Sequence, residues 1–320
     1  MKVFRKSYWF CLAAMGLLFT GCKQLNHRLQ SSTPAASIIS GSGGCHKIAF
    51  VMRQKTNTDI YSVCPDGSKL TNLTDNLVDD MTPAWSQDGT KIAFASARAG
   101  GSQIFVMSAD GSHLTQITSD DQNDLPIWLP DGIHIAFRST DTKGLWRWRL
   151  ADLNSGWVVQ ISEPSYDFFY QTPAWSPDGE RIAYMSLLEQ KDRNDGSSQI
   201  HVKDSDGSND VALTHDIWAN IKPVWSPDGT RLAFLSERDG KYNSFALYLM
   251  AADGTNVQKL TEPVYSDQVT FSWSPDGQQI VIDSDMPVGY LTIIDTKTGA
   301  ASQLLNLLAG ETVSAPAWQP

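Results

Sequence analysis

The sequence predicts an all-β fold: a six-bladed β-propeller closed by pairing the C-terminal strand with the first blade. Three observations predict it. A tryptophan motif recurs six times, each repeat holds four short strand segments, and the chain ends on the one segment that its opening repeat lacks.

The tryptophan motif has the form PAWSPDG and defines the repeat. Successive tryptophans are separated by 43 to 50 residues, a period typical of solenoids and propellers. They are Trp85, Trp128, Trp175, Trp225, Trp273 and Trp318. A large aromatic side chain at one position of every repeat predicts packing between blades rather than a cage for a ligand.

Three further segments follow each tryptophan and predict the other strands of a blade. After Trp85 these are IAF at 92–94, IFVM at 104–107 and LTQIT at 114–118. Alternating apolar and polar residues bounded by Gly, Pro, Asn and Asp are typical of strands. Each repeat therefore has four strands.

The two ends of the repeat region complement each other. The opening repeat has IAF at 48–50, IYSV at 60–63 and LTNLT at 70–74 but lacks a first strand, whereas PAWQP at 316–320 is a first strand without followers. Joining them closes a ring, and a closed ring leaves only short, protected sheet edges.

The succession of PAWSPDG, IAF, an IYVM-like strand, DG and LT resembles the repeats of TolB-related propellers, which are WD40-like. The resemblance covers residues 46–320 and implies a propeller. TolB itself carries a separate domain before its propeller, whereas residues 23–44 here are rich in Ser, Gly and Pro and predict a flexible tether. The role of the Tol system is therefore not carried over with the fold.

The N-terminus predicts export. Lys2, Arg5 and Lys6 precede an apolar run at 8–20, and Gly21 follows. This is the order of a secretory signal, and the apolar run is too short to span a bilayer.

The segment FTGC at 19–22 resembles the lipobox of bacterial lipoproteins, although Phe19 stands where that family usually has Leu. We expect removal of residues 1–21 and attachment of lipid, including palmitate, to Cys22. Residues 22–45 then form the tether and residues 46–320 the propeller. The lipid would hold the domain at the cell membrane or outer membrane, facing the periplasm or the exterior. The alternative is an ordinary signal peptide cut near a cysteine.

Cys45 and Cys64 flank one predicted hairpin. Antiparallel pairing would bring their backbones close, and in an oxidising compartment this predicts a disulfide. Two free thiols are the alternative.

The two faces of the predicted disc differ. One carries uniform Asp-Gly turns, which have a structural role because such turns need a positive φ. The other carries the irregular connections between blades, where binding residues are expected. The expected binding rim there is acidic and aromatic, and consists of Asp79, Asp80, Asp120, Asp121, Asp124, Asp167, Tyr170, Asp216, Trp218, Asp267 and Glu311. Such a rim favours a cationic or peptide ligand. Alternatively, the acids cap turns and the aromatics cover blade edges.

The formal net charge of −10 argues against a nucleic-acid partner, because phosphate binding needs basic patches. The sequence has no GxSxG, HExxH, Walker or GxGxxG motif. We therefore expect a monomeric scaffold that binds an envelope protein or peptide, with no enzymatic activity, no cofactor and no metal site. A structural Ca²⁺ at DSDG (204–207) is the minor alternative to a repeat turn.

The alternative function is a carbohydrate-active enzyme or sugar-binding protein with its site at the acidic channel mouth. Paired carboxylates are the usual requirement for glycoside chemistry. The candidates are Asp121, Asp167 and Asp216, together with His215.

Overall fold

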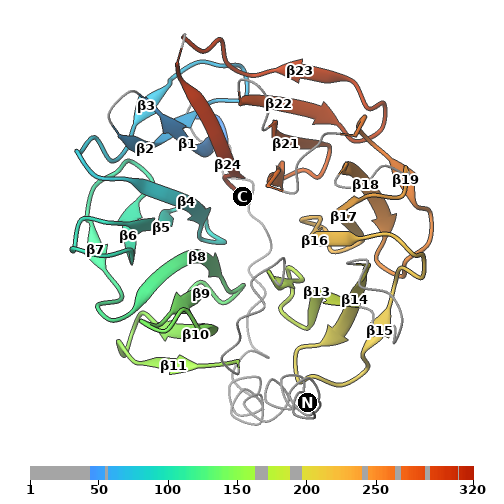
Figure 1. The fold of residues 1–320 in the computed structure, drawn as a ribbon. Coiled ribbons are helices and arrows are strands. Elements are labelled where there is room, and N and C mark those ends of the chain that lie inside the picture. The colour runs from blue at the N-terminus through green and yellow to red at the C-terminus, as the bar shows by residue number, and fades with distance from the viewer. Residues whose placement is uncertain are drawn as a thin grey trace, which may run out of the picture.

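The computed structural model describes residues 44–54, 57–162, 172–187, 197–239, 244–263, 268–284, 289–308 and 310–320. Within these ranges the chain forms six four-stranded antiparallel sheets, arranged as blades around a central axis (Figure 1). The prediction of a six-bladed propeller is confirmed. No helix in the described ranges has the length and apolar character needed to cross a membrane.

Each blade runs from an inner strand beside the axis to an outer strand at the circumference (Figure 1). Blade 1 consists of β24 (Thr312–Trp318), β1 (Ile48–Arg53), β2 (Thr58–Val63) and β3 (Thr71–Asn72). Blade 2 consists of β4 (Asp80–Trp85), β5 (Lys91–Ser96), β6 (Gln103–Ser108) and β7 (Thr115–Gln116). Blade 3 consists of β8 (Gln122–Trp128), β9 (His134–Thr140), β10 (Trp146–Asp152) and β11 (Val158–Gln160).

The remaining blades repeat this order. Blade 4 consists of β12 (Ala174–Trp175), β13 (Arg181–Leu187), β14 (Ser198–Asp204) and β15 (Val211–Ala212). Blade 5 consists of β16 (Asn220–Trp225), β17 (Arg231–Ser236), β18 (Ala246–Ala251) and β19 (Gln258–Lys259). Blade 6 consists of β20 (Phe271–Trp273), β21 (Gln279–Ser284), β22 (Tyr290–Asp295) and β23 (Ala301–Gln303).

The C-terminal strand closes the ring as predicted. β24 pairs antiparallel with β1, with Trp318 opposite Ile48. Beyond the strand, the backbone N–H of Gln319 donates to the Lys47 carbonyl at 2.8 Å. The Gln319 side chain accepts from the Lys47 N–H at 2.9 Å and donates to the carbonyl of Gly89 in blade 2 at 2.8 Å. Gln319, at the C-terminal end of the propeller, thus contacts both the start of blade 1 and the first turn of blade 2.

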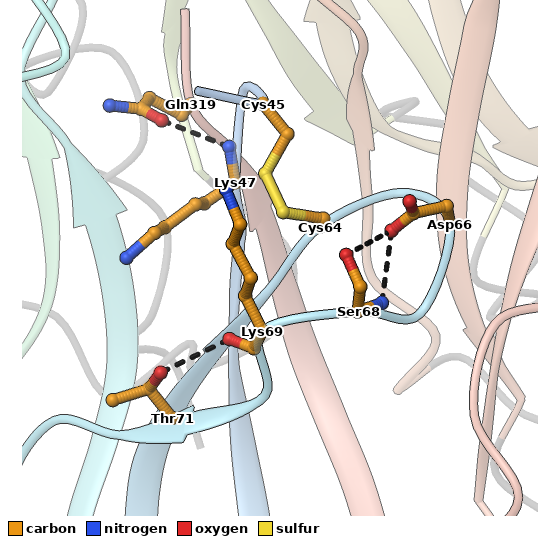
Figure 2. Close-up of a disulfide and its surroundings, with 8 residues drawn as sticks. All are labelled: Cys45, Lys47, Cys64, Asp66, Ser68, Lys69, Thr71 and Gln319. Carbon is orange, nitrogen blue, oxygen red and sulfur yellow. Dashed lines mark hydrogen bonds between the residues drawn. A yellow bond between two sulfur atoms is a disulfide. The ribbon is translucent and has the colours of Figure 1, made fainter. Parts of the chain in front are cut away.

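A disulfide lies beside this closure (Figure 2). Cys45 precedes β1 and Cys64 follows β2, and the structure bonds their sulfurs with the two Cα atoms 5.7 Å apart. The bond therefore joins the two open ends of the first hairpin, two residues before Lys47 contacts Gln319.

The repeated tryptophans pack between blades and also bond them together. The indole N–H of Trp85 donates to the carbonyl of Ala317 in the preceding blade at 3.0 Å, and Trp128 donates in the same way to Ala84 at 3.1 Å. Trp225 and Trp273 repeat the bond with Ala174 and Val224. The prediction of a packing role is confirmed for these residues.

The Asp-Gly turns have a second structural role besides turning the chain. The Asp110 carboxylate accepts hydrogen bonds from the backbone N–H and hydroxyl of Ser112 at 2.9 and 2.6 Å, and Gly111 has φ 88°. A Cβ on Gly111 would lie 2.7 Å from the carbonyl oxygen of Leu73 in blade 1. Glycine is therefore needed here for close contact between blades as well as for its positive φ.

The recurring Leu-Thr segment anchors the start of each blade-to-blade connection. The Thr118 hydroxyl accepts the backbone N–H of Ile104 in β6 at 2.9 Å, and Thr214 accepts that of Ile200 in β14 at 3.0 Å. Thr74, Ser162 and Thr261 do the same in blades 1, 3 and 5. The connections leave each blade from a fixed point.

Candidate binding face

All blades have the same strand order, so the blade-to-blade connections and the first residues of the inner strands share one face of the disc. We call this the connection face. Four of its connections fall at residues 73–79, 117–121, 213–219 and 304–311, with residue 309 not described. The described residues of the expected rim belong to these connections or to the inner strands that follow them.

Asp80, at the start of β4, is fully buried. A guanidinium nitrogen of Arg98 lies 3.0 and 2.9 Å from its two carboxylate oxygens, and the side chain of Asn76 donates to it as well. The Arg98 guanidinium lies 5.3 Å from the ring centroid of Phe94 and 5.2 Å from that of Phe105. Asp80 therefore fixes the connection to blade 2 instead of facing solvent.

The three acids before and within β8 also lie beside arginines. Arg138 contacts both oxygens of Asp124, one of them at 2.7 Å. Arg149 lies 2.9 Å from Asp120 and 4.0 Å from Asp121. The backbone at Asp121 has φ 52°, a left-handed conformation that aspartate tolerates better than most residues.

Asp216 is enclosed by donors. Its carboxylate accepts the backbone N–H of Trp218 at 3.1 Å and the side-chain N–H of Asn220 at 2.8 Å, and lies 3.0 Å from Arg238. Its backbone carbonyl accepts the Gln199 side chain at 2.7 Å. Trp218 is half-buried in the same connection.

The last two described acids, Asp79 and Glu311, differ in exposure. Asp79 is exposed next to Asp80. Glu311 accepts the backbone N–H of Leu308 at 2.9 Å and the side chain of Gln54 at 3.3 Å, which ties the connection into blade 1.

The remaining predicted residues of the rim and the anchor lie outside the described residues. They are Asp167, Tyr170 and Asp267 of the rim, and Cys22 of the predicted lipid anchor.

Four arginines that pair with rim acids were not predicted from the sequence. Arg98, Arg138, Arg149 and Arg238 come from different segments, so no basic cluster is visible along the chain. A repeat alignment could have found two of them, because Arg98 and Arg238 each follow a strand-ending serine by two residues. Each pairs with the connection that enters its own blade. Four arginines therefore offset part of the charge of the seven described rim acids, and the described rim keeps an excess of negative charge.

Large apolar side chains project from the same connections. Leu77 is 92% exposed, Leu308 73% and Ile217 57%, and Met81 on β4 is about half exposed. Exposed apolar side chains next to ordered polar pairs are typical of surfaces that bind other proteins.

Two of the three acids considered for carbohydrate chemistry are described, and each has hydrogen-bond partners of its own. Asp216 is engaged as above, the hydroxyl of Ser139 lies 3.4 Å from Asp121, and His215 is exposed. Within the described ranges no three His, Cys, Asp or Glu side chains are placed to hold a metal ion. At the DSDG segment, Asp206 accepts from Ser208 within a repeat turn.

Fold and face together define a closed propeller scaffold with one regular and one variable face. The chain belongs to the TolB beta propeller domain family, whose sequence pattern matches residues 28–168 and 166–320.

Two comparisons extend this result. The crystal structure of TolB from Acinetobacter baumannii is similar with a TM-score of 0.73 and 24% identity, over 88% of this chain and 69% of that one. A curated relative from Bacillus subtilis (strain 168), named an uncharacterized peptidase YuxL, is 33% identical over 132 residues. That match covers 41% of this chain and 18% of the relative, so this chain matches less than a fifth of the relative's length.

The expectation of a chain without enzymatic activity is contradicted. The Bacillus relative is named a peptidase, and similar folds include an oligogalacturonate lyase in complex with manganese (TM-score 0.51, 16% identity). They also include a puromycin hydrolase variant (TM-score 0.54, 14% identity). The expectation failed because catalytic groups are assembled in space, so missing linear motifs do not exclude them.

Proposed function

We propose that this chain is a lipid-anchored propeller of the bacterial cell envelope that binds a protein or peptide on its connection face. The exposure of Leu77, Ile217 and Leu308 on three connections of that face carries the proposal. Apolar side chains that lose their contact with water on binding supply most of the affinity of a protein interface.

The Asp–Arg pairs support the same proposal. They hold the connections in place before any partner arrives, which reduces the entropy lost on binding. Because the arginines offset only part of the acidic charge, the face suits a partner that combines apolar side chains with some positive charge.

The compartment is proposed from the signal-like N-terminus, the lipobox-like segment at Cys22 and the disulfide. Disulfides persist in oxidising compartments such as the periplasm. Labelling of cells with an alkyne palmitate analogue tests the anchor. We expect label on the full-length protein and none on Cys22→Ala, whereas labelling of the variant would contradict the lipid site.

The binding face is tested by photo-crosslinking. A photoreactive residue at Leu77 should yield a defined crosslinked species in envelope fractions. Replacing Ile217 and Leu308 together by Ser in that protein should reduce its yield at least tenfold.

A matched control uses Leu70 and Leu114, which are 48% and 44% exposed but lie at the starts of outer strands near the opposite face. Replacing these two by Ser should leave the crosslink unchanged. An equal loss in both double variants would overturn the assignment of the face. Because a relative is named a peptidase, mass spectrometry of the captured partner should also record whether it is cleaved.

A further inference from the structure

Blade 4 carries Tyr184, Lys203 and Asp210 at three positions where the other blades carry apolar side chains, whereas the position of His201 is polar or aromatic in every blade. Strand registers define the equivalent positions, since Tyr184 lies opposite His201 as Phe94 lies opposite Phe105 in blade 2. In the other five blades the position of Tyr184 holds Phe50, Phe94, Phe137, Phe234 and Ile282. The position of Lys203 holds Val63, Met107, Ala151, Met250 and Ile294. The position of Asp210 holds Leu70, Leu114, Val158, Val257 and Ala301.

The three exceptional residues and His201 form one contact cluster. The Tyr184 hydroxyl donates to one oxygen of Asp210, and Nδ1 of His201 lies 3.0 Å from the other. The Tyr184 and His201 rings lie 5.5 Å apart, and the Lys203 Nζ lies 4.7 Å from the centroid of the Tyr184 ring. Asp210 is thus the common partner of a tyrosine and a histidine, and the lysine lies against the tyrosine ring.

Burial opposes charge on two of these side chains, Lys203 and Tyr184. Lys203 is 3% exposed, and burial lowers the pKa of its ammonium, while Asp210 partly offsets this. Burial raises the pKa of the Tyr184 hydroxyl, and its hydrogen bond to Asp210 adds to the effect. Buried ionisable groups are generally no more stabilising than well-packed apolar side chains. Departures of this kind from the pattern of the other repeats are expected at functional positions.

The cluster is linked to the connection face by β14. Gln199 lies two residues before His201 on the same strand, and its side chain donates to the backbone carbonyl of Asp216 at 2.7 Å. The Ser198 hydroxyl donates to the carbonyl of Asn220 at 3.1 Å. These bonds hold the connection at 213–219, which presents the exposed Ile217.

We propose that Tyr184, His201, Lys203 and Asp210 form a pH-responsive latch. Protonation of His201 converts its contact with Asp210 into a charge-assisted hydrogen bond, which is stronger than the neutral one. The latch then steadies β14 and, through it, the connection at 213–219. The inference rests on the proposed function, because that connection belongs to the proposed binding face.

The charged and titratable groups described around His201 are consistent with this direction. Tyr184 faces it from β13, Lys203 lies on its own strand, and Asp210 lies in the turn before β15. Asp210 is therefore the carboxylate that pairs with the imidazolium of protonated His201. The connection at 213–219 carries a second histidine, the exposed His215, so the His201→Phe variant is needed to assign the response to His201.

Hydrogen exchange of the isolated protein at pH 5.5 and pH 8.0, corrected for intrinsic rates, tests the latch. We expect residues 211–219 to exchange several-fold more slowly at pH 5.5. Residues 115–121 serve as an internal reference, because Gln103 and Ser102 hold that connection with the same bonds and Phe105 replaces the histidine. The reference segment should show no such difference.

Two variants separate the latch from a general effect on folding. His201→Phe introduces the residue of blade 2, and Asp210→Asn keeps the size of the side chain while removing its charge. Both should abolish the pH response at 211–219 and leave the reference unchanged. An unchanged response in folded His201→Phe, or equal wild-type exchange at the two pH values, would overturn the latch. The measurement needs no partner, so its failure is distinct from a failure of the crosslinking experiment.

Discussion

Gly111 shows how the contact between two blades can depend on a single missing atom. The space beside it is taken by the backbone of Leu73, whereas a Cβ on Gly132, which has a similar positive φ of 67°, would meet nothing within 4 Å. The two glycines occupy turns at the same face and therefore separate the steric effect from the conformational one.

We expect Gly111→Ala to lower the free energy of unfolding by about 3 kcal/mol, because it combines backbone strain with an overpacked contact. Gly132→Ala should lower it by roughly 1 kcal/mol, the strain alone. Urea denaturation of both variants measures the difference. Equal losses would show that the contact with Leu73 has no energetic weight.

His134 is held between two carboxylates. Nδ1 lies 2.6 Å from Asp131, and Nε2 lies 3.6 Å from Asp152. The hydrogen bond to Asp131 raises the pKa of His134, burial opposes this, and the negative charges of Asp131 and Asp152 support it.

A raised pKa of a histidine stabilises the fold below its unfolded pKa of about 6.5, and the contribution is lost as pH rises through the folded value. We therefore expect the difference in unfolding free energy between wild type and His134→Gln to shrink on going from pH 6 to pH 8. Denaturant titrations at both pH values measure it. A difference that grows with pH would contradict the assignment.

At this scale the sequence reasoning placed the tryptophans and the Asp-Gly turns correctly. It could not find the Asp–Arg pairs, because Arg149 and Asp120 are separated by 29 residues and meet only when the strand follows its blade. The cluster at Tyr184 was not predictable from the sequence either. Tyr184 differs from the phenylalanine found at this position in most blades only by its hydroxyl group.

Among the elements, the first hairpin differs from the others by its disulfide. β1 and β2 are paired over their whole length, from Ile48 opposite Val63 to Arg53 opposite Thr58. The Cys45–Cys64 bond therefore adds a covalent link to a hairpin that is already complete.

Replacing both cysteines by Ser should lower the free energy of unfolding by roughly 3 kcal/mol, as expected for closing a loop of this size in the unfolded chain. Thermal unfolding of the variant, compared with wild type under non-reducing conditions, measures this. Mass spectrometry after alkylation provides the control, since two alkylatable thiols in native wild-type protein would show that the bond is absent.

The elements themselves were predictable because period-2 alternation and turn residues are local signals. The outer strands β3, β7, β15 and β19 are only two residues long, shorter than their sequence segments suggested. A strand at the circumference has one neighbour and little apolar surface to bury, and its short length also blunts the sheet edge.

For the molecule as a whole, the acidic composition has a structural origin in the turns. Hydrogen bonds hold the pKa of many turn aspartates below the usual range. For Asp276 the chief cause is the hydroxyl of Ser274, with burial opposing it. The same direction applies to Asp66, Asp110, Asp253 and Asp295.

A carboxylate with a lowered pKa stabilises the fold above its unfolded pKa of about 3.9, and the contribution is lost as pH falls through the folded value. We therefore expect the unfolding free energy to fall steeply below about pH 4. Asp276→Asn should reduce the steepness. Unfolding curves followed by tryptophan fluorescence between pH 2 and pH 6 measure both effects, and a flat profile would contradict the turn network.

The ring as a whole was predictable because its closure depends on counting strands, which needs no knowledge of contacts. The binding surface of the connection face was not predictable, because side chains such as Leu77 and Leu308 belong to segments without periodicity. Their exposure depends on the path of a connection, and only the folded ring fixes that path.

The disulfide lies between the residues that lead to the predicted anchor and the strand pair that closes the ring. A force that pulls on the chain before Cys45 is transmitted along two paths. One path follows the backbone into β1, and the other follows the disulfide to Cys64 after β2. The pull is then shared by two strands of blade 1 instead of peeling β1 alone from β24. A propeller held by one end to a moving membrane would in this way stay shut.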